Sequence, residues 1–249
     1  MRNVASVRSR PCPKTASHAR GYALYRSNVG GSPQATPHEP AISVAWPRCR
    51  GAGVQTELFD MPAVVPGLGF RDAIISPEEE RALIREIDAI ELPHFPFQGW
   101  TSKRRTRSFG WHYDFDKSEF GPADPIPAFL SPLKSRAAAF AGVAADDVVQ
   151  VSILKYEPGA GIGWHRDRPE LDAVIGISLG SPATMRFRRR NGERYDRASI
   201  FLPPRSIYHL DGDVRHGWEH SIVPGTATRW SITFRGLSET GKCKAGHAG

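Results

Sequence analysis

Hydrophobic residues recur at helical spacing in two segments of the chain. Ser76-Pro77-Glu78-Glu79 is a helix start signal, because Ser76 caps the first turn, Pro77 fits the first helical position and Glu79 completes a capping box. Apolar residues then recur at helical spacing to about residue 91, which predicts a helix there. A second helix is predicted over 128–141, with Pro132 close to its start. Both apolar stripes are expected to pack on a core.

After residue 147 the pattern changes to short strand-like segments separated by turn signals. Asn191-Gly192 is typical of a hairpin turn between two of them. Several strands at this spacing predict an antiparallel sandwich or barrel of the jelly-roll type with helices packed outside, so the fold class is mainly β with flanking helices (α+β). The expected strands are 148–156, 173–179, 183–190, 198–202, 206–210, 217–223 and 228–235.

The positive charge of the chain is concentrated at its N-terminus. The 249 residues carry a formal net charge of +7, and residues 1–55 hold eight basic residues against the single acid Glu39, so this segment accounts for the whole excess. It is rich in Ser, Ala, Pro and Gly and lacks hydrophobic periodicity, which predicts a disordered tail. Three interpretations stay open: a nucleic-acid-binding arm, a targeting peptide, or a start assigned too early, upstream of Met61.

Several protein classes are excluded by what the sequence lacks. No apolar run approaches the roughly 18–20 residues of a membrane-spanning helix. The three cysteines, Cys12, Cys49 and Cys243, lie near the chain ends and cannot form a disulfide framework, nor a metal site by themselves. Neither GxGxxG nor GxxxxGK[ST] occurs, so a nucleotide-binding loop is unsupported. We expect one catalytic domain over 56–238 and a flexible tail over 239–249.

A glycine-rich segment leads into the pair His165-x-Asp167. Residues two apart in an extended segment point to the same side, so the imidazole and the carboxylate would share a face. Together with a distant histidine they would form a 2-His-1-carboxylate facial triad, which holds iron and leaves positions open for cosubstrate and dioxygen. His209, His216 and His220 are the candidates for that histidine. The structural alternatives are a surface histidine beside a solvated aspartate and a satisfied core histidine.

Residues 229–235 alternate between polar and apolar side chains. Arg229, Ser231, Thr233 and Arg235 fall on one face of the predicted strand, and the apolar residues between them must cover a core. The polar face would ordinarily be solvated. It could instead line the mouth of a jelly roll that holds an anionic ligand, because guanidinium groups bind carboxylates well.

Four motifs therefore occur together: Tyr156-x-Pro158-Gly159, His165-x-Asp167, the later His220, and Arg229-x-Ser231-x-Thr233-Phe234-Arg235. In this combination the chain resembles the AlkB family of iron(II)- and 2-oxoglutarate-dependent dioxygenases. The resemblance covers roughly residues 58–238. It implies a double-stranded β-helix in which His165, Asp167 and His220 bind Fe(II) and form the catalytic centre.

The resemblance also implies a 2-oxoglutarate site. Arg229 would pair with the distal carboxylate while Tyr156 hydrogen-bonds nearby, and Arg235 would lie close to the metal-bound end and the substrate pocket. Ser231 and Thr233 complete the expected cosubstrate-binding set. The chain departs from the family where members often carry Asn, at Leu154 and Ser231. Both are supporting hydrogen-bond positions, so cosubstrate geometry and substrate choice are less fixed than the metal site.

Substrate contacts are expected from two basic clusters. The resemblance implies that residues 95–116 form a nucleotide-recognition lid. In this segment basic residues precede Phe109, Trp111, Tyr113 and Phe115, which follow at strand period and on one face, and this order suits phosphate contact followed by base stacking. Alternatively, these aromatic residues pack on the core beside a solvated basic loop. The second cluster surrounds the Asn191-Gly192 turn, over residues 186–197, and would be either a solvated hairpin or, for a polynucleotide substrate, a hairpin that contacts phosphates. The residues expected to touch substrate are Arg104, Arg105, Arg107, Trp111, Tyr113 and Arg188.

The predicted function is oxidative demethylation of N-alkylated bases in DNA or RNA, as in repair of alkylation damage, with Fe(II), 2-oxoglutarate and dioxygen. The alternatives are a 2-oxoglutarate oxygenase acting on a protein or small molecule, and a non-catalytic nucleic-acid-binding module that keeps the fold. We expect a monomer that is cytoplasmic or nucleoid-associated and has no membrane partner, with organelle targeting by the basic tail left open.

Overall fold

The computed structural model describes residues 65–97, 100–114 and 119–246. The chain divides into two units, Met1–Phe59 and Asp60–Gly249, and every described residue belongs to the second. The basic tail expected over residues 1–55 therefore lies outside the described residues. No helix in the described ranges is long and apolar enough to cross a membrane.

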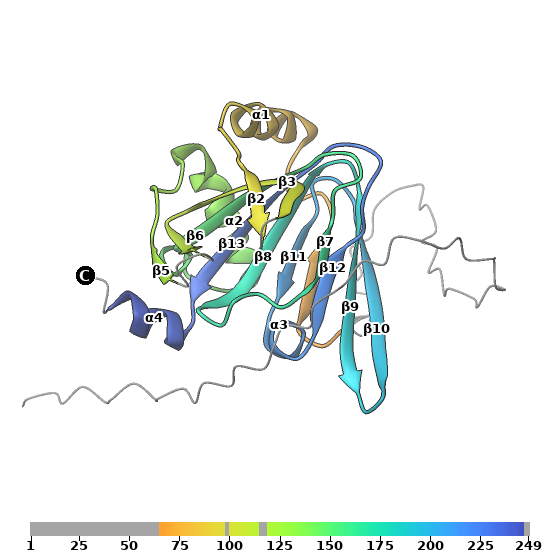
Figure 1. Cartoon of the computed structure of the whole chain (residues 1–249). Coiled ribbons are helices and arrows are strands. Elements are labelled where there is room, and N and C mark those ends of the chain that lie inside the picture. The colour runs from red at the N-terminus through yellow and green to blue at the C-terminus, as the bar shows by residue number, and fades with distance from the viewer. Residues whose placement is uncertain (1–64, 98–99, 115–118, 247–249) are drawn as a thin grey trace, which may run out of the picture. The chain divides into compact units, whose positions relative to one another are not determined.

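The described chain is built on two antiparallel sheets (Figure 1). The major sheet has the strand order β1-β11-β8-β13-β6-β3-β2, and the minor sheet has the order β10-β9-β12-β7. Strands β4 and β5 pair with each other. The bounds in the major sheet are β1 Leu68–Arg71, β2 His94–Phe97, β3 Trp100–Phe109, β6 Gln150–Tyr156, β8 Leu171–Gly180, β11 Ile207–Leu210 and β13 Arg229–Leu237. The remaining strands are β4 Trp111–Asp114, β5 Glu119–Pro122, β7 Ile162–His165, β9 Ala183–Asn191, β10 Arg194–Leu202 and β12 Glu219–Ile222.

The expected mainly-β fold with flanking helices is confirmed. Each of the seven strands predicted after residue 147 corresponds to a strand of the structure, from β6 to β13. The hairpin predicted at Asn191-Gly192 joins β9 to β10, with Arg194 opposite Asn191 at its closed end. Strands β1 to β5 and strand β7, which carries His165, were not among the predicted strands.

Helix α1, Pro77–Asp88, begins as its sequence predicts. The Ser76 hydroxyl accepts the Glu79 backbone N–H at 3.2 Å, and the Glu79 carboxylate accepts the Ser76 backbone N–H at 2.9 Å. This reciprocal capping box satisfies two amide groups that the first helical turn otherwise leaves unpaired. The buried carboxylate of Glu80 then accepts the Gly180 amide at 2.8 Å and Arg205 Nη1 at 3.0 Å, which fixes α1 to the major sheet.

The second predicted helix is divided at its N-terminus. Residues Ala128–Leu130 form a 3-10 turn (η1), and α2 follows over Ser131–Ala141 with Pro132 in its first turn. A second 3-10 turn, η2, covers Ala145–Asp147, and the short α3 covers Gly212–His216. Proline is tolerated in the first turn because its missing N–H would be unpaired there.

The two faces of the major sheet are covered by two separate clusters of buried apolar residues. The first lies between the sheet and the helices, and unites Leu83 and Ile87 of α1 with Leu133 of α2 and with Ile232 and Phe234 of β13. The second lies between the two sheets, on the opposite face of the major sheet. The space between the sheets is therefore where the polar face of β13 points.

The expectation of one aromatic face over residues 109–115 is wrong. Strand β3 ends at Phe109, which is buried in the helix-side core, and the chain bends at Gly110 before β4 begins at Trp111. Gly110 has φ of +77°, and a Cβ there would overlap the Val149 carbonyl oxygen. Only glycine fits this bend, so Phe109 is separated from Trp111 and Tyr113. Phe115 lies outside the described residues.

The flexible tail expected over 239–249 instead begins with a helix, α4, over Glu239–Ala245. The Ser238 hydroxyl caps it by accepting the Gly241 amide at 3.1 Å. Gly241 lies so close to the Glu170 carbonyl oxygen that a Cβ would overlap it, and Lys244 reaches the Glu170 carboxylate at 2.6 Å. These contacts, which no apolar periodicity indicates, order the segment against the domain.

Candidate active site

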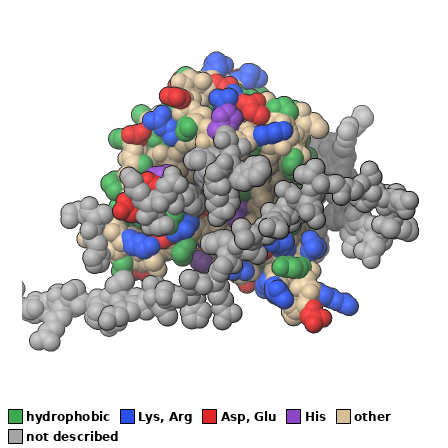
Figure 2. Space-filling model, viewed as in Figure 1, with side chains coloured by type: hydrophobic (Ala, Val, Ile, Leu, Met, Phe, Trp, Pro, Cys, Tyr) green, Lys and Arg blue, Asp and Glu red, His purple; other side chains and the backbone are tan. Residues whose placement is uncertain are grey.

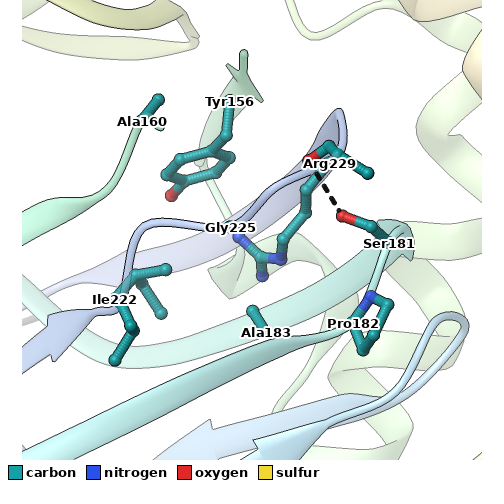
Figure 3. A pocket seen from close by; sticks show the side chains of 10 residues that line it. Tyr156, Ala160, Ser181, Pro182, Ala183, Ile222, Gly225 and Arg229 are labelled. Atoms are coloured by element: carbon teal, nitrogen blue, oxygen red, sulfur yellow. Dashed lines mark hydrogen bonds between the residues drawn. The ribbon is translucent and has the colours of Figure 1, made fainter. Parts of the chain in front are cut away.

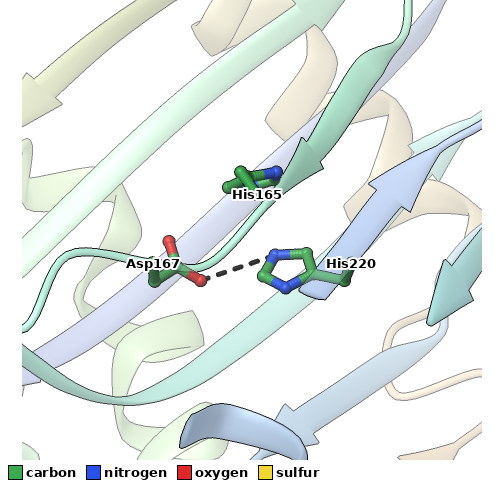
Figure 4. Close-up of side chains that lie close together, drawn as sticks. All are labelled: His165, Asp167 and His220. Carbon is green, nitrogen blue, oxygen red and sulfur yellow. Dashed lines mark ion pairs between the residues drawn. The ribbon is translucent and has the colours of Figure 1, made fainter. Parts of the chain in front are cut away.

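Three metal-ligating side chains meet between the two sheets. His165 ends β7, and His220 of β12 lies directly opposite it in the antiparallel register. Asp167 follows His165 by two residues, immediately beyond the strand. The ligand atoms of the three side chains all lie within 4.8 Å of one another, and Figure 4 shows the side chains converging. Of the candidate histidines, neither His209 nor His216 belongs to this group.

Both imidazoles present the chemical form that binds metal. His165 Nδ1 lies 3.0 Å from the Gly163 carbonyl oxygen. A carbonyl oxygen only accepts, so Nδ1 carries a proton and, in the neutral ring, Nε2 is the nitrogen available to a metal. Burial, and next the neighbouring His165, lowers the pKa of His220 to about 3. His220 is therefore neutral near pH 7 and can act as a ligand.

Asp167 supplies an anionic oxygen that lacks a donor. Burial would raise the pKa of its carboxyl, but the positive charge of Arg235, more than any other neighbour, holds that pKa well below its usual range. Oδ1 accepts Arg235 Nη2 at 3.0 Å. Oδ2 is buried without a hydrogen-bond donor and lies 3.5 Å from His220 Nε2. A buried carboxylate oxygen beside two neutral imidazoles suits a divalent cation, and two nitrogens with one oxygen is the donor set of non-haem Fe(II).

The polar face of β13 is buried, so the interpretation of a solvated face is wrong. Arg229, Ser231 and Thr233 are each less than 5% exposed. They point between the sheets because Ile232 and Phe234, on the other side of the strand, are buried against the helices. The period of the sequence predicted both faces, but only the presence of the minor sheet decides that the polar face is enclosed.

Arg229 has hydrogen-bonding capacity that the described residues do not use. Its Nε donates to Ser178 Oγ at 3.1 Å, while Nη1 and Nη2 are buried with no hydrogen-bond partner. The guanidinium carbon lies 4.9 Å from the centre of the Tyr156 ring. Figure 3 shows both side chains at a pocket lined by Tyr156, Ala160, Ser181, Pro182, Ala183, Ile222, Val223, Gly225, Ala227 and Arg229. Two unpaired guanidinium nitrogens facing a pocket are suited to a carboxylate.

Tyr208 is a site residue that the sequence did not reveal. It lies on β11 opposite Gly176, where a Cβ would overlap its phenol ring and hydroxyl. Burial raises the pKa of Tyr208 to about 12, and its charge environment comprises Arg229, Tyr156, Arg235 and Asp167. Its hydroxyl is therefore a neutral donor placed among the site residues. Strand 206–210 was predicted, but nothing in its sequence pattern indicates that this tyrosine lies in the site.

Arg235 lies further along β13, at the metal side of the site. Besides Asp167, its Nη1 donates to Gln150 Oε1 at 3.1 Å and to Ser152 Oγ at 3.2 Å. The resemblance placed Arg235 near the metal-bound end of the cosubstrate, and its contact with Asp167 agrees with that place. Ser231 is opposite Ser178 and Leu154, so small or apolar side chains surround it.

The segment that carries Asp167 is anchored by the buried Arg215 of α3. Its guanidinium donates to four backbone carbonyl oxygens, at distances between 2.6 and 3.3 Å, those of Asp167, Arg168, Leu171 and Asp172. Among the described side chains, Arg215 makes the largest number of hydrogen bonds to the backbone carbonyls of residues 167–172. The sequence analysis did not identify Arg215, because an isolated arginine in a short helix has no distinctive pattern.

The three arginines expected to bind substrate on β3 point to different sides. Arg104 lies opposite Tyr156, which in turn lies opposite Arg229, so Arg104 shares the face of the site. Arg105 is exposed on the alternate face. Arg107 is on that same alternate face, where it pairs with Asp124 at 2.7 Å. Only Arg104 is brought to the site side of the sheet.

The aromatic residues of β4 remain near the site without entering the triad. Trp111 stacks on Phe120 with ring centres 5.3 Å apart. The Arg168 guanidinium lies 3.4 Å from the centre of the Tyr113 ring, which places Tyr113 beside the segment after Asp167. Arg188, the remaining expected substrate contact, pairs with Glu219 at 2.6 Å on β12.

Comparison with known proteins gives consistent similarities. The family model for the 2OG-Fe(II) oxygenase superfamily matches residues 75–235, which contain the triad and both arginines. The tRNA (carboxymethyluridine(34)-5-O)-methyltransferase alkbh8 of Xenopus tropicalis is 29% identical over 168 residues, a match that covers 66% of this chain and 26% of the relative. This chain thus spans about a quarter of that curated relative.

Two further similarities cover more of the other protein. The alpha-ketoglutarate-dependent dioxygenase alkB homolog 7, mitochondrial, of Bos taurus is 28% identical over 181 residues, covering 72% of this chain and 74% of the relative. The solved structure of OsALKBH1 matches with a TM-score of 0.54 and 16% identity, over 69% of this chain and 97% of the other. At this identity the structural likeness shows the fold.

Proposed function

The chain belongs to the 2OG-Fe(II) oxygenase superfamily, and from this premise we propose that it oxidatively removes N-linked alkyl groups from nucleobases in DNA or RNA. The predicted resemblance to AlkB proteins is confirmed, since AlkB homologues are among its relatives. Its cofactors are Fe(II) and 2-oxoglutarate. The observation that carries the proposal is the pairing, in one enclosed space, of an unsatisfied Asp167 oxygen with an unsatisfied Arg229 guanidinium.

The metal is held by His165 and His220 through nitrogen and by Asp167 through oxygen. Arg235 keeps the Asp167 carboxylate ionised and fixes Oδ1, which leaves Oδ2 directed at the two imidazoles. Arg215 fixes the backbone on which Asp167 is carried. These two arginines act through Asp167, so we assign them a positioning role.

The cosubstrate is bound through its carboxylates. Arg229 binds the distal carboxylate with its two unpaired nitrogens, and the Tyr156 ring packs against the same guanidinium. Tyr208, with a neutral buried hydroxyl, would donate a hydrogen bond to the cosubstrate in the same space, and this would replace the support that is missing at Leu154 and Ser231. Ser231 and Thr233 line the buried face between the two arginines.

When bound, Fe(II) and 2-oxoglutarate activate dioxygen, so that the cosubstrate becomes succinate and carbon dioxide while a substrate C–H bond is hydroxylated. Hydroxylation of an N-methyl group gives an N-hydroxymethyl base, which loses formaldehyde and restores the base. The protein contributes positioning and an enclosed site, since Arg229, His220 and Tyr208 are all buried.

Nucleic acid is the substrate class that the surroundings support best. The alkbh8 relative carries tRNA in its name, although the named methyl transfer belongs to a protein of which this chain spans only 26%. Arg104 lies on the site face of β3, and Tyr113 lies beside the segment after Asp167 with the Arg168 guanidinium over its ring. Basic groups and an aromatic ring near the site suit a phosphate and a base. We place the oxygenase domain at residues 56–238, with residues 95–116 as the substrate lid.

The test is an assay of the full chain with Fe(II), 2-oxoglutarate and oligonucleotides that carry N-methylated bases. We expect formaldehyde only from the methylated strand. Asp167→Ala should abolish it, because the mutation removes the anionic ligand. The matched control is Asp72→Ala, which removes an exposed aspartate outside the site and should retain turnover.

The alternatives give different results in the same assay. Succinate production that never depends on a methylated strand would indicate a protein or small-molecule substrate. Absence of any 2-oxoglutarate turnover in the parent, with strand binding retained, would indicate a binding module. Either result would contradict the proposed demethylation.

A further inference from the structure

The two faces of the minor sheet carry different chemistry. His165 and His220 point inward, and Phe187, opposite His220, is buried between the sheets. Residues of opposite parity on β9 and β10 therefore point outward. We call this surface the outer face, and it is formed by Arg186, Arg188 and Arg190 of β9 and by Tyr195, Arg197 and Phe201 of β10.

The outer face holds more positive charge than the fold itself neutralises. Among the described residues, Arg188 is the one of its four arginines with an ion-pair partner, Glu219. Arg188 also lies directly opposite Arg197 in the strand register. Like charges placed opposite each other destabilise a sheet. Glu219 offsets this repulsion at Arg188, whereas Arg197 has no ion-pair partner among the described residues, so an anion bound at Arg197 would stabilise the arrangement. Figure 2 shows Lys and Arg side chains gathered towards the end of the β9–β10 hairpin.

The same surface exposes aromatic rings that a sheet would ordinarily bury. Phe201 is 60% exposed and Tyr195 is 39% exposed. The Arg188 guanidinium lies 4.6 Å from the centre of the Trp164 ring and 4.9 Å from that of Tyr195. Arginines held against rings keep their N–H edges directed outward for acceptors. The outer face thus alternates guanidinium groups with flat apolar platforms.

We propose that the outer face binds single-stranded nucleic acid, with phosphates on its arginines and bases stacked on Phe201 and Tyr195. This combination suits an unpaired strand, because a duplex keeps its base faces inside the stack and an acidic peptide has no planar bases. The inference deepens the proposed function, since the strand would be the one that carries the alkylated base. Strand β7 links the two sites, with Trp164 on the outer face and His165 in the metal centre.

The contribution of the arginines is tested by measuring the affinity of the full chain for unmodified, fluorescently labelled oligo-dT and oligo-U. Fluorescence anisotropy gives this affinity at several salt concentrations. The variant Arg186→Ser/Arg197→Ser removes two exposed arginines that make no ion pair among the described residues. We expect about tenfold weaker binding at low salt and a shallower dependence of log Kd on log salt, by roughly one for each phosphate that loses its arginine. The matched control Arg81→Ser/Arg85→Ser removes two exposed arginines of α1 and should bind like the parent.

Stacking is tested by Phe201→Ser, which should weaken binding roughly tenfold with an unchanged salt dependence. Its matched control is Phe70→Ser, because Phe70 is also an exposed strand phenylalanine, at 41%, but lies on β1 of the major sheet. Both positions are exposed, so the melting temperatures should stay close to that of the parent, which circular dichroism would check.

Three results would overturn the proposal. The first is that the outer-face variants bind the single strand with the same affinity as their controls. The second is an equal weakening of duplex binding, which would make the surface a general polyanion site. The third is weaker binding of the variants to phosphatidylserine vesicles with strand binding kept, which would make it a membrane surface.

Binding and catalysis are separated in this design, because the strand is unmodified and the assay omits Fe(II) and 2-oxoglutarate. Asp167→Ala should bind the strand as the parent does. Strand binding through the outer face without demethylation would contradict only the proposed function. Demethylation with no effect of the outer-face variants would contradict only this inference.

Discussion

Arg229 and Arg235 lie on the same face of β13 but differ in how many of their hydrogen-bond donors are paired. Arg235 is occupied by Asp167, Gln150 and Ser152, whereas two nitrogens of Arg229 have no hydrogen-bond partner. Two buried guanidinium nitrogens without acceptors are costly, so the arrangement points to a bound anion. The two arginines thus divide the site into a metal side and a carboxylate side.

At the scale of single residues, Tyr208 gives the sharpest prediction. Tyr208→Phe removes only the hydroxyl, and a hydrogen bond to a carboxylate is worth roughly 1.5–3 kcal/mol, so we expect 2-oxoglutarate to bind about tenfold more weakly or worse. Anaerobic titration of the Fe(II)-loaded protein with 2-oxoglutarate would measure this by calorimetry. The ring stays in place, so the melting temperature should change little.

The control for Tyr208 is Tyr195→Phe, which removes a tyrosine hydroxyl on the outer face of the minor sheet. Its 2-oxoglutarate affinity should equal that of the parent. Equal affinities for Tyr208→Phe and the parent would mean that the Tyr208 hydroxyl faces something other than the cosubstrate.

The residues of the metal centre were predictable because their spacing is rigid. His165 and Asp167 are two residues apart along the chain, and the resemblance selected His220 from three histidines. Tyr208 could not be found in this way, because its ring occupies its place only where the neighbouring strand carries Gly176, which has no side chain to overlap it. The basic cluster on β3 shows the reverse, because it is split between the two faces of the strand and only Arg104 lies on the site side, opposite to Arg105 and Arg107.

At the scale of elements, β13 shows how far periodicity reaches. Its alternation correctly predicted a face with Ile232 and Phe234 in the core and a face with the arginines. Whether that polar face is solvated depends on the minor sheet. The minor sheet covers it through contacts between residues far apart in the sequence, which periodicity does not reveal. The bend at Gly110 and the helix α4 were missed because each depends on a close backbone contact with a distant segment.

Arg215 in α3 is expected to hold the segment that carries Asp167. Arg215→Met removes one buried donor group from four carbonyl oxygens, and we expect a loss of roughly 3 kcal/mol in the free energy of unfolding. Metal affinity should also fall about tenfold, because the ligand backbone is no longer fixed. Urea denaturation and Mn(II) titration would measure the two effects.

Arg166→Met is the matched control, because Arg166 is an exposed arginine beside Asp167. It should change neither stability nor metal affinity. A variant Arg215→Lys that keeps one donor should recover part of the metal affinity. Unchanged Mn(II) binding by Arg215→Met would show that Arg215 serves stability alone.

At the scale of the molecule, the charge has a different meaning from the one its total suggests. The excess of +7 belongs to residues 1–55, so the remaining chain is formally neutral. The positive charge on which our proposals depend is local, on the outer face of the minor sheet and at Arg104. Composition alone could not separate these contributions, because it records no position.

Acid stability should depend on how α4 is held to the rest of the domain. Burial would raise the pKa of Glu170, but the hydrogen bond from Lys244 and the contact with Arg168 lower it overall. A carboxyl with a lowered folded-state pKa stabilises fully above its unfolded pKa and loses that contribution as pH falls through the folded value. Glu170→Gln should therefore destabilise the protein at neutral pH and flatten the decline in stability below about pH 4.5.

Thermal unfolding as a function of pH would measure this effect. Glu239→Gln is the control, because Glu239 pairs with Lys242 at the surface and its side chain is 90% exposed. Its stability profile should follow that of the parent. Parallel acid profiles for Glu170→Gln and the parent would place the loss of acid stability elsewhere.

The most direct measurement is the ratio of succinate to formaldehyde formed by the full chain on a strand with N-methylated bases. If the enclosed site couples cosubstrate oxidation to demethylation, the two products should form in equal amounts. Both should disappear in Asp167→Ala. Succinate that forms at the same rate with and without the methylated strand, and with no formaldehyde, would contradict the proposed demethylation.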